Sequence, residues 1–489
     1  MRTRLFCKLT FILSSLIGII QFQLTATGLS QNYPPVTINY SATEGFRHPE
    51  KKIVIIITSF KNKDWYRANL DSVYRQNYQN YRVIYLDDNS PDGTGALVAA
   101  YLKENGQEHR TTLIRHTEWQ SQMANHYNAV YLCDDDEIIC QLDGDDFLYD
   151  ENTLNIINHI YHDESVWITV GLPVMSDNWQ QYPDLVPDKL KEEIVSSNGF
   201  RRRQEGWPYN HLRTFRAWLF KQIKLEDLMF KSSFKTLSPC PDVAMLYPMY
   251  EMAGFHGHVV KNLLYVWNVK NPISQRYITP LAKILDVDYT IRFSWPLYQP
   301  LEAPIINYSE QFKNKKCDLI IFVAKDEIFQ STCSIASKIT NINLVHVLSD
   351  VSLSEPQSFY DTLVDTVKSC SQDYIILSSA TAQITQSVNA SLAIQELERT
   401  FAHGFYLHLK YGSDIFPLCG QLTQDLFAWQ PQYTKHILSQ PNLLGAILYR
   451  KKDILNQLQT IHPTSCVEFK KMWAELEIPE RSVGLFYKN

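Results

Sequence analysis

The stretch Lys52-Ile-Val-Ile-Ile-Ile-Thr58 is a continuous run of mostly β-branched residues, and it decides the fold of the first half of the chain. A strand of this kind is typical of a parallel sheet covered by helices on both faces. Further strands are predicted at 81–86, 112–115 and 137–142, and helices at 94–103 and 120–132. Strands that alternate with helices predict an α/β fold with a mostly parallel sheet and right-handed crossovers.

Two of these strands end in acidic clusters, Leu86-Asp-Asp-Asn-Ser90 and Leu142-Asp-Gly-Asp-Asp146. Ligands of open α/β sheets bind outside the carboxyl ends of the strands, so both clusters lie where a binding site is expected. Carboxylate oxygens suit Mg²⁺ or Mn²⁺, which readily bridge a protein to a diphosphate. The alternative for an isolated D-x-D is a plain acidic turn. A calcium-binding EF-hand loop is excluded, because its twelfth position would be Leu154 rather than Glu.

After a proline-containing segment at 295–314, which is predicted to be a linker, the pattern starts again. Residues 315–324, 348–352 and 373–382 echo 51–60, 86–90 and 136–145 in the same order. In this alignment Ala380, Ala382 and Gln383 replace the three aspartates of the second cluster, whereas Asp350 persists where Asp88 stands. The sequence therefore predicts a second α/β domain at 315–489 without catalytic activity. Either it is a degenerate copy of the first domain or it has converged on the same generic pattern.

The first 30 residues are expected to be a targeting segment rather than part of the fold. Arg2, Arg4 and Lys8 precede the mostly apolar stretch Leu9–Ile20, which is shorter than the roughly 20 residues that a spanning helix needs. This pattern fits a signal peptide or a signal-anchor. We therefore expect an exported or membrane-associated protein, in an endomembrane lumen or a bacterial envelope.

Composition excludes one class of partner. The chain has 489 residues and a formal net charge of −6, so it lacks the basic footprint of a nucleic-acid-binding protein. Its nine cysteines include no C-x-x-C pair, so neither a zinc site nor a disulfide framework is indicated.

Several of these motifs together resemble family 2 glycosyltransferases. Thr58-Ser-Phe60, Leu86–Thr94, Asn128 and Leu142–Asp146 occur in the order and spacing of that family, and the resemblance covers about residues 51–276. It implies a GT-A fold at 51–294 and inverting transfer of a sugar from a nucleoside diphosphate, with a UDP-linked sugar as the expected donor. By the same resemblance Thr58 and Asp88 would hold the base, Asp143 would reach the ribose, and Asp145 with Asp143 would bind Mn²⁺ or Mg²⁺.

The resemblance also points to residues after the acidic loop. Asp242, in Cys240-Pro-Asp242, stands where the family has its general base, although an Asp here could equally be a helix N-cap. Lys270 and Arg276 would face the diphosphate, and His211 and Arg213 the acceptor. His256 and His258 are candidates for a third metal ligand. Unlike many relatives, the chain has no Arg or Lys between His116 and Leu142.

The predicted function is metal-assisted transfer of a sugar to a hydroxyl of a saccharide, glycolipid or protein. Two alternatives remain open: a nucleotidyltransferase on a related fold, and a non-catalytic carbohydrate-binding or scaffold protein. The first normally has a glycine-rich loop after strand one, and Thr58–Lys63 contains no glycine.

Overall fold

A computed structural model describes most of the chain after residue 47. The described residues are 48–181, 210–229, 240–273, 279–306, 308–324, 330–350, 357–382, 384, 386–407, 420–422, 426–430, 444–476 and 482–487. The predicted targeting segment and Arg276 lie outside them. Within these ranges, no helix is both long and apolar enough to span a membrane.

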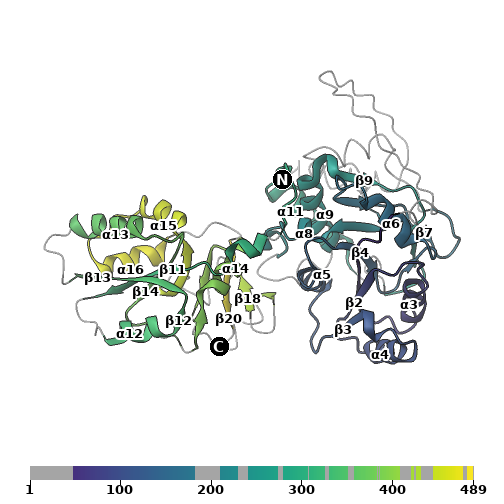
Figure 1. Ribbon diagram of the computed structural model, residues 1–489, viewed down its shortest axis with the longest axis horizontal. Coiled ribbons are helices and arrows are strands. Elements are labelled where there is room, and N and C mark those ends of the chain that lie inside the picture. The colour runs from purple at the N-terminus through teal and green to yellow at the C-terminus, as the bar shows by residue number, and fades with distance from the viewer. Residues whose placement is uncertain are drawn as a thin grey trace, which may run out of the picture. The chain divides into compact units, whose positions relative to one another are not determined.

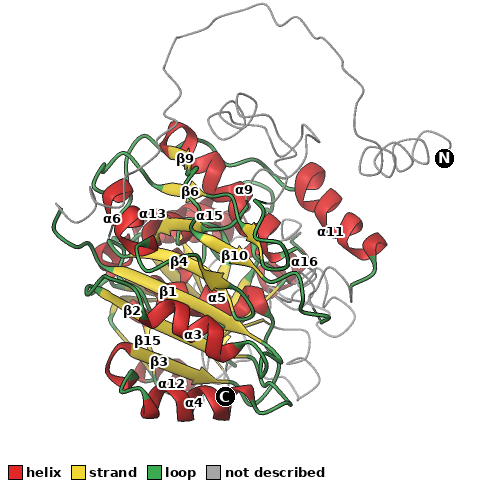
Figure 2. Cartoon of the chain, turned by 90° about the vertical axis from the view of Figure 1, so that its right-hand side faces the viewer, coloured by secondary structure: helices red, strands yellow, loops and turns green. Residues whose placement is uncertain are grey.

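The first domain is built on a seven-stranded sheet in the order β3-β2-β1-β4-β8-β6-β9. Its strands are β1 (Ile53–Ser59), β2 (Tyr81–Asp87), β3 (Thr111–Arg115), β4 (Ile138–Asp143), β6 (Ile168–Val170), β8 (Arg213–Arg216) and β9 (Gly257–Val259). The first four strands pair in parallel, as the sequence predicts, and lie side by side in Figure 2. Strand β8 runs antiparallel between β4 and β6, so it brings a distant segment next to the acidic end of β4.

Helices cover both faces of this sheet, and as a result every residue of β1 is buried. One face packs against α3 (Tyr66–Tyr74), α4 (Thr94–Glu104) and α6 (Thr153–Tyr161). The other packs against α5 (Gln122–Tyr131), α8 (Ala217–Phe220) and α9 (Pro241–Ala253) (Figure 1). A small sheet consists of β5 (Phe147–Leu148), β10 (Tyr265–Trp267) and β7 (Val174–Met175), and its strand β5 directly follows the acidic loop in the chain.

In its described residues, the segment predicted to be a linker has no regular helix or strand between α11 (Leu281–Ser294) and a short 3₁₀ helix at Tyr308–Phe312. It is not loose along its whole length. Trp295 is buried, and the Tyr298 hydroxyl donates to Asp227 at 2.6 Å. The backbone N–H of Leu301 donates to the Met252 carbonyl at 2.9 Å. The first part of this segment therefore packs on α9.

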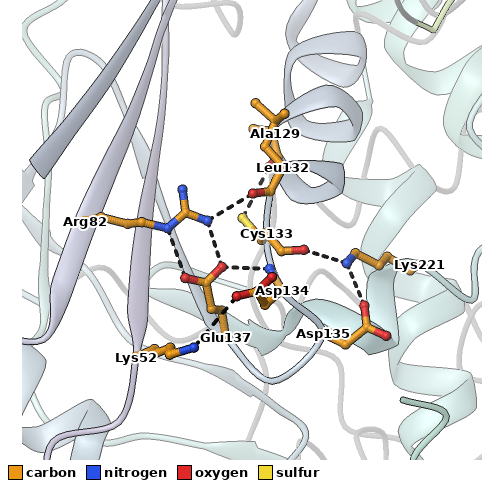
Figure 3. A network of polar contacts seen from close by, with 9 residues as sticks. All are labelled: Lys52, Arg82, Ala129, Leu132, Cys133, Asp134, Asp135, Glu137 and Lys221. Atoms are coloured by element: carbon orange, nitrogen blue, oxygen red, sulfur yellow. Dashed lines mark hydrogen bonds and ion pairs between the residues drawn. The ribbon is translucent and has the colours of Figure 1, made fainter. Parts of the chain in front are cut away.

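The acidic turn before β4 is a network of ion pairs at the amino end of that strand (Figure 3). Arg82 makes two hydrogen bonds to Glu137, at 2.9 and 2.7 Å, and a third to the Leu132 carbonyl. Lys221 bridges Asp135 and the Cys133 carbonyl, both at 2.6 Å. Burial is the largest influence on the pKa of Glu137 and acts to raise it, but the hydrogen bonds from Arg82 and the Asp134 N–H, together with the charges of Arg82 and Lys52, lower the net pKa. This turn is a structural clamp at the end of β4 opposite to the acidic loop.

We expect Arg82→Met to lower the free energy of unfolding by about 2 kcal/mol without altering the acidic loop at the other end of β4. The Glu137 side chain is only 6% exposed and would lose its charged partner. Urea denaturation measures the loss. The matched control is Lys52→Met, which removes only an exposed 3.7 Å contact to Asp134 and should change stability little. Equal effects of the two variants would contradict this role of Arg82.

A second domain follows, built on an eight-stranded sheet in the order β13-β11-β14-β19-β16-β20-β18-β17. Its strands are β11 (Cys317–Val323), β13 (Ile342–Ser349), β14 (Tyr374–Ser379), β16 (Gly404–Tyr406), β17 (Gly420–Gln421), β18 (Leu426–Trp429), β19 (Gly445–Arg450) and β20 (Gly484–Tyr487), with β12 (Ile339–Thr340) and β15 (Val388–Asn389) paired apart. Its helices are α12 (Gln330–Ser337), α13 (Gln357–Ser369), α14 (Ala390–Arg399), α15 (Lys451–Leu458) and α16 (Cys466–Glu475).

The two sheets share one topology. The order β2-β1-β4-β8-β6-β9 is repeated by β13-β11-β14-β19-β16-β20, and the corresponding strands follow each other in the same chain order. Each corresponding pair also agrees in direction, including the single antiparallel strand, β8 or β19, next to the central parallel strands. Among the described residues, the second sheet has no counterpart of β3, so β13 is an edge strand. This agreement favours duplication over convergence on a generic pattern.

A buried arginine supports the duplication at the level of single contacts. Arg216 ends β8, and its guanidinium donates to carbonyl oxygens at the end of α6 and just before β6. Arg450 ends β19 and donates in the same way to carbonyl oxygens in the last turn of α14 and just before β16. Each arginine also begins the helix that follows its strand. A generic α/β pattern does not require this shared arrangement.

The strand register corrects the predicted alignment of the acidic loop by one residue. Asp143 pairs with Thr58, and its counterpart Ser379 pairs with Phe322. The next N–H in each domain donates to the carbonyl oxygen of that same partner residue: Gly144 to Thr58 at 3.0 Å, and Ala380 to Phe322 at 2.9 Å. The aspartates at 143, 145 and 146 therefore correspond to Ser379, Thr381 and Ala382, and not to Ala380, Ala382 and Gln383. The second loop still lacks every carboxylate of the first.

Candidate active site

The loop after β4 is held rigidly against β1 and α3. A side chain at Gly144 would place its Cβ 2.7 Å from the Asn62 amide and 2.8 Å from Ser59, so only glycine fits. The Asn69 amide donates to the carbonyl oxygens of Asp143 and Asp146, at 3.0 and 2.7 Å. These contacts fix where the three aspartates of the loop point.

Each of the three carboxylates has a different partner. Asp146 is buried and accepts from the Tyr265 hydroxyl at 2.5 Å and the Asn268 N–H at 2.6 Å, so it ties the loop to β10. Asp145 accepts from the Asn271 amide at 2.7 Å, and Asp143 from the Gln122 amide at 3.0 Å. Asp146 therefore has the most constrained carboxylate, while Asp143 and Asp145 are half-buried and each accept a side-chain amide.

His211 lies beside this loop. Ligand atoms of Asp143, Asp146 and His211 lie within 4.8 Å of one another, close enough to hold one metal ion. The imidazole packs against the Tyr265 ring in a tilted arrangement, with 4.5 Å between centroids, and its buried Nδ1 has no hydrogen-bond partner among the described residues. Burial lowers the pKa of His211 well below its ordinary value, which favours the neutral form that binds metals. The predicted ligand Asp145 is not in this group.

Negative charge is concentrated in the loop. Burial, followed by the charges of Asp242 and Asp145, raises the pKa of Asp143 to about 7. Burial also raises the pKa values of Asp145 and Asp146. Buried carboxylates of like charge are costly when ionised, and a bound cation would offset that cost.

Asp242 lies next to the same site, because its partner Arg213 pairs in β8 with Gln141, two residues before Asp143 in β4. Helix α9 begins at Pro241, and Cys240 is its N-cap without a side-chain cap bond. Asp242 therefore lies inside the first turn, and the alternative that it is a plain N-cap is wrong. Its Oδ1 lies 2.8 Å from the Arg213 guanidinium, whose side chain is 3% exposed, whereas the Asp242 side chain is 31% exposed. The Asp242 carboxylate is thus held by a buried arginine and remains partly exposed.

The residues predicted to hold the nucleotide lie at the ends of β1 and β2. Asp88 is 3% exposed and accepts from the backbone N–H groups of Gln120 and Ser121, at 2.6 and 2.9 Å. It therefore fixes the start of α5. Thr58 lies 3.5 Å from the Gln122 amide that also binds Asp143. Contact of Thr58 and Asp88 with a base stays a prediction.

The remaining predicted residues do not all lie at the acidic loop. Lys270 is exposed on the loop after β10, and Arg276 is outside the described residues. His256 stacks on Trp167 and contacts the Ser165 carbonyl, so His211, rather than His256 or His258, lies beside the carboxylates. Arg213 contacts Asp242, and its contact with an acceptor stays a prediction.

Some site residues were not predicted from the sequence. Gln122, Tyr265 and Asn271 orient the three carboxylates of the loop. His126 is buried behind the site with its Nε2 3.2 Å from the Gln141 amide, and burial lowers its pKa to about 4. Only Gln122 has a sequence signal, since it lies at the start of the helix that leads into β4.

We expect Asp143→Asn to stabilise the metal-free protein at pH 8. The pKa of Asp143 is raised from 3.8 to about 7 in the folded state, so its favourable contribution is present below pH 3.8 and is lost as the pH rises through 7. Removing the charge should therefore raise Tm by a few degrees at pH 8 and by less at pH 5. Thermal unfolding in EDTA at both pH values measures this, with exposed Asp134→Asn as the control. A lower Tm of Asp143→Asn than of the wild type at pH 8 would contradict a destabilising charge at Asp143.

The first domain matches a known protein family. Residues 54–229 match the model of the family described as Glycosyl transferase family 2. No curated protein sequence matches the chain. Solved structures with some similarity include TarS of S. aureus, at 14% identity and TM-score 0.37 over 49% of this chain, and a TarS fragment in complex with UDP-GlcNAc, at 13% identity and TM-score 0.37 over 51%. A mannosyltransferase from Pyrobaculum calidifontis in complex with GDP-Man and Mn²⁺ aligns at 16% identity and TM-score 0.33 over 47%.

The alignments cover 39% of the TarS chain, 68% of the TarS fragment and 63% of the mannosyltransferase. The sequence match spans β1 to β8 and includes the acidic loop, so it covers the elements that build the site except α9, β10 and the loop after β10. The first domain has a GT-A-like α/β fold with a largely parallel sheet, and a second sheet-containing domain follows it. The first domain is a glycosyltransferase domain and belongs to glycosyl transferase family 2.

Proposed function

We propose that the first domain transfers a sugar, with inversion, from a nucleoside diphosphate to an acceptor hydroxyl, with a divalent cation bound in the acidic loop. A UDP-linked sugar is the expected donor. The observation that carries this proposal is the closeness of two carboxylate groups: the Asp143–Asp146 loop follows β4, and Asp242 of α9 contacts Arg213, which pairs with Gln141 of β4.

Asp242 is the proposed general base. Inverting transfer needs a carboxylate that accepts the proton of the acceptor hydroxyl while that oxygen attacks the anomeric carbon. Arg213 holds Oδ1 of Asp242 at 2.8 Å from a buried position, so the side chain has a fixed orientation. Its partial exposure leaves it accessible to an acceptor. Holding the base and the donor in fixed positions favours direct attack.

The residues of the loop fit a hard cation such as Mn²⁺ or Mg²⁺. Asp143 and Asp145 are the proposed carboxylate ligands, since Asp146 is occupied by Tyr265 and Asn268. We add His211, whose ligand atom lies within 4.8 Å of that of Asp143. When bound, the cation would offset the charge that develops on the diphosphate leaving group. Carboxylate oxygens and a neutral imidazole suit such an ion.

The substrates are assigned by position. We propose that Thr58 and Asp88 bind the base of the donor, that Lys270 and Arg276 face its diphosphate, and that His211 and Arg213 border the acceptor, which is a saccharide, glycolipid or protein. We also propose export or membrane association through residues 1–30.

The test is a panel of nucleotide sugars incubated with the full chain and Mn²⁺. We expect one or a few of them to be hydrolysed or transferred, with UDP released, and EDTA to abolish the reaction. Metal-dependent binding without any turnover across donors and acceptors would instead support a carbohydrate-binding or scaffold protein. Release of pyrophosphate from a nucleoside triphosphate and a sugar phosphate would support a nucleotidyltransferase.

A further inference from the structure

Three potential metal ligands of different chemistry meet in the second domain, outside the site described above. Asp318 lies near the start of β11, His346 in β13, and Cys370 directly after α13. Ligand atoms of all three lie within 4.8 Å of one another. No acidic loop or catalytic residue of the first domain contributes to this group.

The Asp318 carboxylate is buried and already oriented. Its Oδ1 accepts from the Asn343 amide at 3.0 Å and from the Leu344 N–H at 3.1 Å, and its Oδ2 accepts from the Gln372 N–H at 3.1 Å. Such contacts fix a carboxylate in the way that outer hydrogen bonds fix metal ligands. The nearby cation Lys451 donates to the carbonyl oxygens of Lys368 and Cys370.

The imidazole points to a ligand rather than to ordinary packing, and the thiol is within reach of the same ion. Cys370 is 3% exposed, and its sulfur lies within 4.8 Å of ligand atoms of Asp318 and His346. The Nε2 atom of His346 is buried and has no hydrogen-bond partner among the described residues. An unsatisfied buried polar atom costs about 1–3 kcal/mol, and a metal bond would remove that cost. The half-exposed His346 side chain leaves a route for an ion.

The distances allow a tetrahedral ion after a small contraction. With metal bonds of about 2.0–2.3 Å, ligand atoms in a tetrahedral zinc site lie roughly 3.3–3.7 Å apart, against an upper limit of 4.8 Å here. Thiolate and imidazole ligands favour Zn²⁺ over Mn²⁺ or Mg²⁺, which prefer oxygen. This group therefore differs in metal preference from the acidic loop of the first domain.

We propose that Asp318, His346 and Cys370 form a Zn²⁺ site that clamps the edge strand β13 and the end of α13 to β11. On binding, the Cys370 S–H bond is replaced by a Zn–S bond and one proton is released to water, and a water molecule completes the coordination. The proposed site lies at the edge of the second sheet. Among the described residues, β13 has no outer neighbour, whereas its counterpart β2 is flanked by β3. Unsupported edge strands are weak points of a sheet.

Cobalt binding by the full chain tests the site. After chelation of resident metal, Co²⁺ should give a thiolate-to-cobalt charge-transfer band in the near ultraviolet that saturates at one equivalent. Cys370→Ser should lose the band. The matched control is Cys317→Ser, which removes a different buried thiol, at the start of β11, and should keep the band. Asp143→Ala should keep it too, because the acidic loop contains no cysteine, so this result is independent of the proposed function.

A second measurement covers the case in which Cys370→Ser does not fold. In the wild-type chain, Zn²⁺ should protect Cys370 from alkylation, mapped by mass spectrometry, and His346→Gln should abolish this protection. In Asp143→Ala, whose acidic loop has lost a proposed ligand, Zn²⁺ should still raise Tm by several degrees. Absence of the cobalt band in the wild type, its persistence in Cys370→Ser, or alkylation of Cys370 at the same rate with and without Zn²⁺ would overturn the site.

Discussion

Asp242→Asn is expected to lower kcat by at least about a hundredfold while the Kd of the donor changes little. This is the usual size of general-base catalysis, and an amide cannot accept the acceptor's proton. The amide keeps an oxygen for the Arg213 guanidinium, which lies 2.8 Å from Oδ1 of Asp242, so the local structure should persist. Steady-state kinetics and donor titration separate the two effects.

The matched control for this prediction is Glu251→Gln in the same helix. Glu251 is 5% exposed and accepts from the Tyr298 N–H at 3.0 Å, in the part of α9 that packs on the segment after α11. Its substitution should leave kcat unchanged. If Asp242→Asn retained most of its turnover, or lost donor affinity as strongly as turnover, Asp242 would not be the base.

Asp145→Ala is expected to abolish transfer and metal-dependent nucleotide binding while the protein stays folded. Asp145 is the proposed carboxylate ligand whose partner in the structure, the Asn271 amide, can be displaced without breaking the anchor that Asp146 provides. Calorimetric titration of UDP with Mn²⁺ and with EDTA measures the loss. Circular dichroism checks the fold.

Two further variants sharpen this experiment. Asp134→Ala removes an exposed acid at the other end of β4 and should leave binding unchanged. His211→Gln should weaken metal-dependent binding if the imidazole shares the ion with Asp143. Metal-dependent binding that persists in Asp145→Ala would contradict this role of Asp145. We expect no second nucleotide site in the second domain, because Ser379, Thr381 and Ala382 replace the aspartates. Full turnover by Asp145→Ala, or activity unaffected by EDTA, would remove the metal from the mechanism.

One inference from the sequence about the second domain changes with the structure. Asp350 was expected to persist where Asp88 would hold a base, and its position after β13 matches that of Asp88 after β2. Its carboxylate accepts from the Cys466 N–H at the start of α16, at 2.6 Å. Asp88 instead accepts from backbone N–H groups at the start of α5. The retained aspartate in the second domain thus has a structural contact of its own.

The sequence by itself determined the strands β1, β2, β3 and β4 and the placement of both acidic clusters at their carboxyl ends. These features are local: a β-branched run specifies a buried strand, and parallel strands bring their carboxyl ends to one edge. The echo between the two halves was likewise visible, because it repeats the same local pattern. The domain boundaries 51–294 and 315–489 stay predictions.

Only the tertiary structure decided which side chains meet. Strand β8 inserts antiparallel beside β4 and carries Arg213 to Asp242, while the segment just before it brings His211 to Asp143. The one-residue shift in the alignment of Ser379 with Asp143, and the meeting of Asp318, His346 and Cys370, likewise became visible only in the folded chain. The physical reason is that such contacts depend on strand order and register between distant segments. Local periodicity indicates which residues form a strand, but not which neighbour that strand will have.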